Sequence, residues 1–107
     1  MTANGSPLSR LSGATRRLLD YVALISDGAP YAVLRHLARI SEEDMVIELR
    51  EAVDAGLLAV LPGRPNAYDF VDPSVRELVL EQIGAERLPK LRTRVEAARR
   101  RVEGPDA

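Results

Sequence analysis

The sequence predicts a mainly α-helical domain that carries one short β-hairpin. Hydrophobic residues make up 46% of the chain but aromatic residues only 4%, so the core must be built from Leu, Val, Ile and Ala, a composition that favours helices over a sandwich of strands. Apolar residues recur at intervals of three and four through most of the chain, which is the spacing of a helix that buries one face. A length of 107 residues is typical of one domain.

Two helices are predicted in the first part of the chain. Residues 1–10 are mostly small and polar, which predicts a flexible lead-in, and Ser12 is a predicted N-cap. The apolar face of the first helix is predicted to consist of Leu18, Leu19, Val22 and Ile25. Gly28 and Pro30 break this helix, and a short second helix follows with the apolar side Val33, Leu34 and Leu37.

A third helix is predicted from Ser41 to a stop at Gly56. Ser41 can cap it, and the acidic residues of its first turn complement the positive end of the helix dipole. Gly56 is suited to the left-handed position that follows many helices. The predicted apolar side consists of Met45, Val46, Leu49, Ala52 and Val53.

The hairpin is predicted next, followed by one or two helices. Residues 57–61 are a short apolar run, residues 62–66 with two Pro and one Gly are predicted to be the loop, and the returning strand contains Tyr68, Phe70 and Val71. Asp72 and Pro73 begin a helix as N-cap and first helical residue, with the apolar face Val75, Leu78, Val79 and Ile83. After Gly84 and Pro89, a narrow stripe suited to packing on another helix is formed by Leu88, Leu91, Val95, Ala98 and Val102.

Three helices followed by a two-stranded hairpin are the winged helix-turn-helix arrangement. We therefore expect a winged-helix domain over residues 11–103, which includes the amphipathic C-terminal helix, and a short tail over residues 104–107. A lone hairpin is marginally stable in water, so the wing is expected to pack on the helices.

The third predicted helix is strongly acidic. Residues 41–56 contain six acidic residues and one Arg, which gives a local charge of −5. A helix that reads DNA lies against a dense line of phosphates, so this charge argues against ordinary DNA reading by this helix. The acids either solvate an outer face or meet a partner, and the candidate interaction residues are Glu42, Glu43 and Glu48.

The end of the chain has the opposite sign. Residues 86–103 contain seven basic and three acidic residues, a local charge of +4. Such a run is either the solvated face of an amphipathic helix or a surface for an acidic partner or a nucleic-acid backbone. The candidate residues are Arg87, Lys90, Arg94, Arg99 and Arg101, together with Arg64 at the predicted tip of the wing, which can reach a phosphate or a minor groove.

Nothing in the sequence predicts catalysis. The chain has no Cys, and its single His36 has no partner residue of known geometry, which favours a structural or surface role. Lys90 has no Gly-rich approach, so a phosphate-binding loop is not predicted. No apolar run is long enough for a membrane span and no signal-peptide pattern opens the chain, so we expect a cytoplasmic protein without a membrane partner.

Three segments resemble one domain of the large bacterial signalling ATPases known as the STAND class. They are Leu11-Ser12-Gly13-Ala14-Thr15-Arg16-Arg17-Leu18-Leu19, then Glu51-Ala52-Val53-Asp54-Ala55-Gly56-Leu57-Leu58, then Tyr68-Asp69-Phe70 leading into Val75-Arg76-Glu77. The domain is the winged helix that follows the nucleotide-binding and lid domains, and the class includes the large LuxR-type transcriptional regulators. The resemblance extends from about Leu11 to Val102.

The resemblance implies a regulatory module that packs against a nucleotide-binding domain of the same or a neighbouring polypeptide and helps to hold the inactive, ADP-bound state. ATP or ADP would be bound by that parent protein, and this chain would carry no cofactor of its own. At the start of the helix after the hairpin, where the family places a His that approaches the ADP phosphates, this chain has Asp72, whose charge would oppose a phosphate.

The sequence therefore predicts a non-catalytic winged-helix module for protein interaction. The alternative is a stand-alone winged-helix DNA-binding transcriptional regulator, a homodimer formed through the stripe from Leu88 to Val102. A small enzyme is a third hypothesis that no sequence feature favours.

Overall fold

A computed structural model describes residues 11–25 and 28–103 of the chain. The predicted lead-in at residues 1–10 and the predicted tail at residues 104–107 lie outside the described residues. The described fold is mainly helical, with five helices and a small antiparallel sheet. None of the helices within the described ranges combines the length and the apolar character that crossing a membrane requires.

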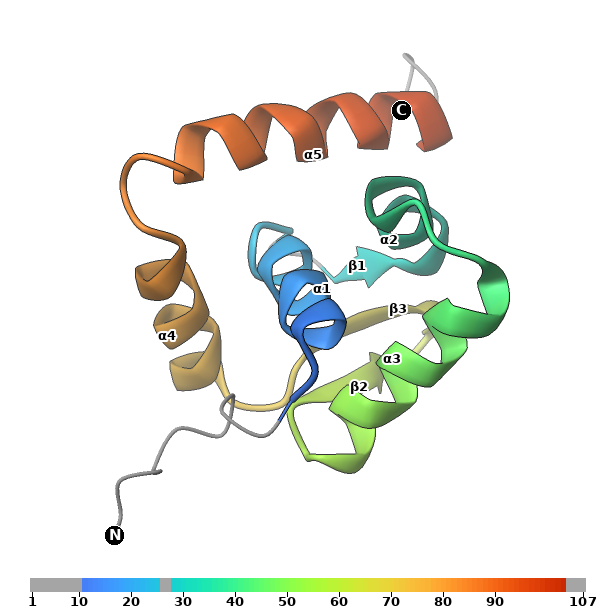
Figure 1. The fold of residues 1–107 in the computed structure, drawn as a ribbon. Helices are drawn as coiled ribbons and strands as arrows, with labels where there is room; N and C mark the ends of the chain where they lie inside the picture. Colours follow the sequence, from blue (N-terminus) through green and yellow to red (C-terminus); the bar gives the residue numbers. More distant parts are fainter. Residues whose placement is uncertain (1–10, 26–27, 104–107) are drawn as a thin grey trace, which may run out of the picture.

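The elements follow the predicted order, with one short strand added. The helices are α1 (Gly13–Ala23), α2 (Tyr31–Ala38), α3 (Glu42–Asp54), α4 (Pro73–Ile83) and α5 (Leu88–Glu103), and the strands are β1 (Ala29–Pro30), β2 (Leu58–Leu61) and β3 (Arg64–Phe70). Figure 1 shows α1 at the centre, with α5 along one side of the molecule and α3 and the hairpin on the other. Helix α1 contacts α2, α3, α4 and β3, so these four elements pack around it.

The three predicted N-caps are confirmed. The Ser12 Oγ accepts a hydrogen bond from the Thr15 amide at 3.2 Å, and the Ser41 Oγ accepts one from the Asp44 amide at 3.1 Å. The Asp72 Oδ1 accepts one from the Ser74 amide at 2.9 Å, and Pro73 is the first residue of α4. Each cap satisfies an amide that the first turn of a helix leaves without an intrahelical partner.

The sheet differs from the prediction because it has three strands in the order β1-β3-β2. The unpredicted strand β1 pairs Ala29 with Tyr68 and Pro30 with Ala67, so β3 is the central strand. A strand of two residues has no periodicity for a sequence pattern to reveal.

The predicted loop at residues 62–66 is also wrong, because β3 already begins at Arg64. Gly63 has a φ of 78°, which allows a tight turn, and a register shift follows Val60. Pro65 is tolerated in β3 because β1 reaches only Ala67 and Tyr68, so β3 has a single neighbouring strand at the proline.

The core gathers residues from every helix, as predicted. Its largest fully buried side chains come from α1, α2, α3, β2 and α4 together with the residues that adjoin them, and include Leu18, Leu19, Ile25, Leu34, Met45 and Leu58. From α5, Val95 and Ala98 are buried against the rest, and α5 packs mainly on α2 (Figure 1). The predicted stripe of α5 does pack on a helix, and that helix belongs to the same chain.

The predicted apolar side of α3 is too wide. Met45, Leu49 and Ala52 are buried, but Val46 is 52% exposed and Val53 is 40% exposed. Helix α3 packs on one flank only, against α1 and β2, so its buried stripe is narrow and two of the five predicted residues lie outside it. Those two valines belong to the outer surface of the molecule.

Candidate interaction surfaces

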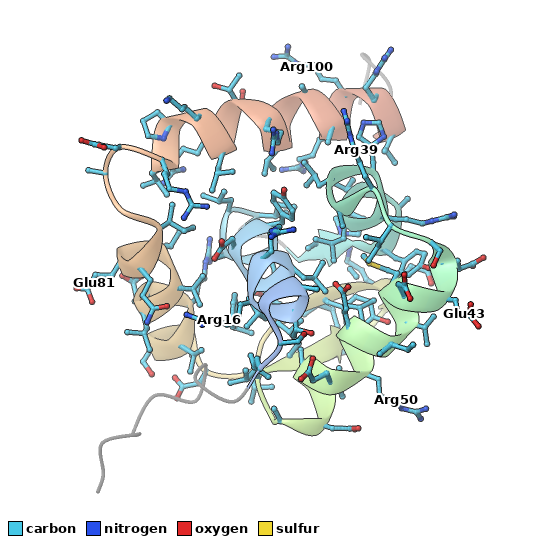
Figure 2. The ribbon with its side chains drawn as sticks, in the orientation of Figure 1. Arg16, Arg39, Glu43, Arg50, Glu81 and Arg100 are labelled. Atoms are coloured by element: carbon cyan, nitrogen blue, oxygen red, sulfur yellow. The ribbon has the colours of Figure 1, made fainter. Side chains whose placement is uncertain are left out.

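The outward side of α3 combines acidic and aliphatic side chains. We define the α3 outer face as the exposed residues of this helix, namely Glu42, Glu43, Asp44, Val46, Ile47, Arg50, Val53 and Asp54. Ile47 is 61% exposed and Val46 52%, and Figure 2 shows Glu43 and Arg50 directed away from the body of the molecule. Large aliphatic side chains exposed beside one another on one helix face are a feature of interaction surfaces.

Glu51 belongs to α3 but not to this face, because it reaches the first turn of α1. Its carboxylate accepts hydrogen bonds from the Ser12 Oγ at 3.1 Å, from the Ser12 amide at 3.3 Å and from the Thr15 Oγ1. The hydrogen bond from Thr15, followed by those from Ser12, lowers the pKa of Glu51 below its ordinary value. The sequence prediction counted Glu51 among the acids of one helix and missed this structural role.

Glu48 lies on the flank of α3 that is turned toward α1. Its side chain is half-buried, and desolvation raises its pKa, with further increases from the nearby Asp44 and Glu51. The positive charge of Arg17 on α1 has the opposite effect and lowers the pKa of Glu48. Of the three acidic residues predicted to meet a partner, only Glu42 and Glu43 lie on the α3 outer face.

Asp72 is an exposed helix cap. Its Oδ1 accepts hydrogen bonds from both the amide of Ser74 at 2.9 Å and the Ser74 Oγ at 2.8 Å. These bonds to Ser74 lower the pKa of Asp72, so the residue is a carboxylate at neutral pH. Its geometry is that of a cap, and a role toward nucleotide stays a prediction.

The predicted basic residues divide into two groups. Arg87, Lys90, Arg94 and Arg101 line three surface hollows on or next to α5. Arg99 is half-buried elsewhere on α5, and Arg64 is exposed at the start of β3 on the other side of the molecule from α5. The structure therefore brings four of the six predicted basic residues to one region.

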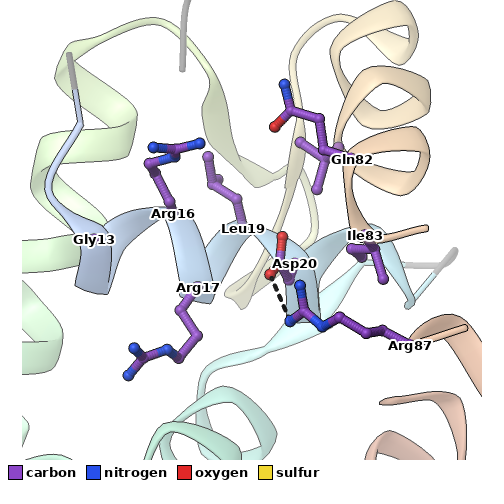
Figure 3. A pocket seen from close by; sticks show the side chains of 9 residues that line it. Gly13, Arg16, Arg17, Leu19, Asp20, Gln82, Ile83 and Arg87 are labelled. Carbon is purple, nitrogen blue, oxygen red and sulfur yellow. Dashed lines mark ion pairs between the residues drawn. The ribbon is translucent and has the colours of Figure 1, made fainter. Parts of the chain in front are cut away.

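The first hollow lies between α1 and α4, measures about 260 Å³ and is drawn in Figure 3. Arg16 and Arg17 enter it from α1, and Arg87 enters it from the segment before α5. Asp20 lies among them, and its Oδ2 is 3.9 Å from the Arg87 Nη2. Desolvation raises the pKa of Asp20, while the charge of Arg87, and then those of Arg16 and Arg17, act in the opposite direction.

The other two hollows continue along α5. One, of about 270 Å³, is lined by Arg87, Lys90, Leu91 and Arg94. The next, of about 360 Å³, lies between α2 and α5 and is lined by His36, Arg39, Arg94 and Arg101 together with small and aliphatic residues. The predicted interaction residues did not include Arg16, Arg17, His36 or Arg39, because only the packing of α1 on α4 and of α2 on α5 places them beside these hollows.

The described residues of these surfaces include no cluster of metal-ligating side chains. His36 is exposed beside arginines and has no carboxylate among its neighbours in the hollow. Comparisons with protein-family models, with curated proteins and with solved structures found no match to this chain.

Proposed function

We propose that this chain is a non-catalytic winged-helix regulatory module that binds another protein through the α3 outer face. The proposed parent system is a STAND-type ATPase that acts in signalling or transcription. Three helices followed by an antiparallel hairpin, as the fold has them, support the winged-helix assignment. The sequence segments that resemble the winged helix of these ATPases support the parent system.

The observation that carries the proposal is the composition of the α3 outer face. In a winged helix that reads DNA, the third helix enters the major groove. Here that helix presents Glu42 and Glu43 with the exposed Val46 and Ile47. The acids repel phosphates, and the aliphatic side chains gain nothing from a polar groove edge apart from thymine methyl groups.

The same composition suits a protein partner. The centre of a protein interface is apolar and poor in charge, while its rim is polar. Val46, Ile47 and Val53 supply the exposed apolar surface, with Arg50 among them, and Glu42 and Glu43 supply negative charge toward the start of the helix. The partner we propose is the nucleotide-binding domain of the same or a neighbouring polypeptide, with a surface of aliphatic residues bordered by Arg or Lys. ATP or ADP would be bound by that domain.

The competing DNA-binding regulator needs α5 as its dimer interface. In the structure α2 packs on α5, and Val95 and Ala98 at the centre of the stripe are both buried. Val102, at the C-terminal end of the stripe, is 38% exposed. A second copy would have to displace α2 or use the remaining edge. This arrangement favours the protein-binding module.

The test uses the full chain and the ATPase domain encoded in the same or the adjacent reading frame. Ile47→Lys is expected to weaken the complex at least about tenfold, measured by calorimetry, because it places a charge at the centre of the interface. Val71→Lys is the matched control, because Val71 is 58% exposed, similar to 61% for Ile47, and lies outside the α3 outer face. Equal affinities for the two variants would contradict the proposal.

A mobility-shift titration tests the competing function directly. The module is expected to bind promoter and scrambled DNA with equal, weak affinity that collapses as salt rises. Tight, sequence-dependent binding at physiological salt that Glu43→Arg alters would show that α3 reads DNA, and it would overturn the protein-binding proposal.

A further inference from the structure

The three hollows beside α5 form one continuous cationic surface. Arg87 lines both the first and the second hollow, and Arg94 lines both the second and the third. We call this surface the cationic track. The track also contains His36 and one acid, Asp20. Its seven Arg or Lys side chains are Arg16, Arg17, Arg39, Arg87, Lys90, Arg94 and Arg101.

The geometry of α5 explains why the charges form a line. Lys90, Arg94 and Arg101 are spaced by four and seven residues, so they lie on the same edge of the helix. At a rise of about 1.5 Å per residue they extend over roughly 16 Å, which is nearly five phosphate intervals of about 3.4 Å along one strand of a duplex. Arg92 and Arg100 belong to the opposite side of the helix, and Figure 2 shows Arg100 directed away from the molecule.

The single acid of the track does not cancel this charge. The Asp20 side chain is only 21% exposed and pairs with Arg87, whose side chain is 60% exposed. Asp20 lines the first hollow and forms an ion pair with Arg87 there (Figure 3). Among the described residues, the Arg87–Asp20 contact is the one ion pair that the seven basic side chains of the track form.

Arg39 adds a positive charge to the track from the end of α2. It caps the C-terminus of α2 with a φ of 56°, in the left-handed region that glycine adopts without cost. It is the only residue other than glycine with a positive φ in the described part of the chain. Backbone strain of this kind is typical of positions whose side chain is needed, and the Arg39 side chain lines the third hollow.

We propose that the cationic track binds the phosphodiester backbone of double-stranded nucleic acid without sequence preference. None of the exposed large aliphatic side chains lines it; these are Val46, Ile47, Val53, Val60, Val71 and Val102. An interface with a protein needs an apolar centre, whereas contacts to phosphates need only positive charge. No Phe, Tyr or Trp side chain lines the track either, so it lacks the platforms on which the bases of a single strand stack.

This inference adds a second surface to the proposed module and does not depend on the first. Helix α5, which carries Lys90, Arg94 and Arg101 of the track, and helix α3 lie on different sides of the molecule (Figure 1). A nucleic acid seated along α5 would keep its phosphates away from the acidic α3. The module would then hold a polyanion on one side and a protein on the other.

The first experiment measures the full chain binding a random duplex of about 20 base pairs by fluorescence anisotropy over a series of salt concentrations. Arg94→Gln and Arg101→Gln are each expected to reduce the slope of log K against log salt by about 0.9, and the double variant to weaken binding about tenfold at low salt. Arg92→Gln and Arg100→Gln, on the opposite side of the same helix, are the matched controls. An equal loss in both pairs would show a diffuse charge effect and overturn the site.

The second experiment separates binding from folding. Arg39→Gly relieves the left-handed strain at the end of α2, so it is expected to raise the Tm while it weakens duplex binding. Both changes together support the track. If Arg39→Gly is more stable but binds the duplex with the affinity of the parent, Arg39 does not contact the ligand. If Arg94→Gln also binds the duplex with the affinity of the parent, the proposal is overturned.

The third experiment distinguishes the polyanions. Poly-glutamate, which carries the same sign of charge without phosphates, is expected to compete for the track at least about tenfold less well than the duplex. Stronger binding of poly-glutamate, with the same dependence on Arg94, would identify an acidic protein as the ligand and overturn the nucleic-acid assignment. Ile47→Lys changes the α3 outer face and not the track, so it is expected to bind the duplex at least as tightly as the parent does. The failure of the α3 proposal can therefore be distinguished from the failure of the track proposal.

Discussion

Glu51, one of the acidic residues of α3, stabilises the contact between α3 and α1. Its carboxylate satisfies Ser12 and the fully buried Thr15 at the first turn of α1, and so joins the central helix to α3. The six acids of residues 41–56 therefore have different tasks: Glu51 ties two helices, the charge of Arg17 acts on Glu48, and the other four, Glu42, Glu43, Asp44 and Asp54, are exposed. A count of charges along a sequence cannot separate these tasks, because they depend on which neighbour each side chain meets.

Glu51→Gln is expected to lower the free energy of unfolding at pH 7. The folded pKa of Glu51 lies below its ordinary value of 4.5, so the ionised carboxylate stabilises the fold above that value and this contribution is lost as the pH falls through the folded pKa. The difference between the parent and the variant should therefore close in acid. Chemical unfolding measured at pH 7 and at about pH 3 checks this, since a gap that stayed constant would contradict the role of the charge.

At the scale of single elements, the sequence predicted α1, α3 and α4 with their caps, because Ser12, Ser41 and Asp72 are local signals that need no tertiary contact. The limits of the hairpin and the width of the apolar side of α3 were wrong. Both depend on what packs beside the element, β1 beside β3 and α1 beside α3, and this information is not local.

Leu49→Ala tests the corrected orientation of α3. Leu49 is 4% exposed, and truncation of such a side chain is expected to cost about 2 to 5 kcal/mol. Ile47→Ala on the same helix is the control, because Ile47 is 61% exposed and its loss should change stability by less than about 0.5 kcal/mol. Similar costs at the two positions, measured by denaturant unfolding, would contradict the orientation of the helix.

At the scale of the whole molecule, the two candidate surfaces differ in how far the sequence predicted them. The α3 outer face comes from one helix, so its acids were predicted, although its exposed valines were assigned to the core. The cationic track draws on α1, α2 and α5, and the sequence indicated only the part that α5 contributes. A surface assembled from three distant segments becomes visible only when the helices are packed.

Gly28 lies where the sheet meets the body of helices, and a side chain there should be costly. Its φ is 97°, and an added Cβ would collide with the side chain of Leu61. Gly28→Ala is expected to destabilise the protein by about 1 to 3 kcal/mol through overpacking and the unfavourable φ. Thermal unfolding of this variant beside Gly13→Ala, whose added Cβ meets nothing within 4 Å, provides the comparison.

The short strand β1 has a mechanical consequence. It is bonded to the middle of the hairpin through β3, and its last residue, Pro30, leads directly into α2, which carries His36 and Arg39. Two residues of backbone therefore connect the β2–β3 hairpin to α2, the helix that packs on α5. A displacement of the hairpin is expected to shift α2 and the hollow that it shares with α5.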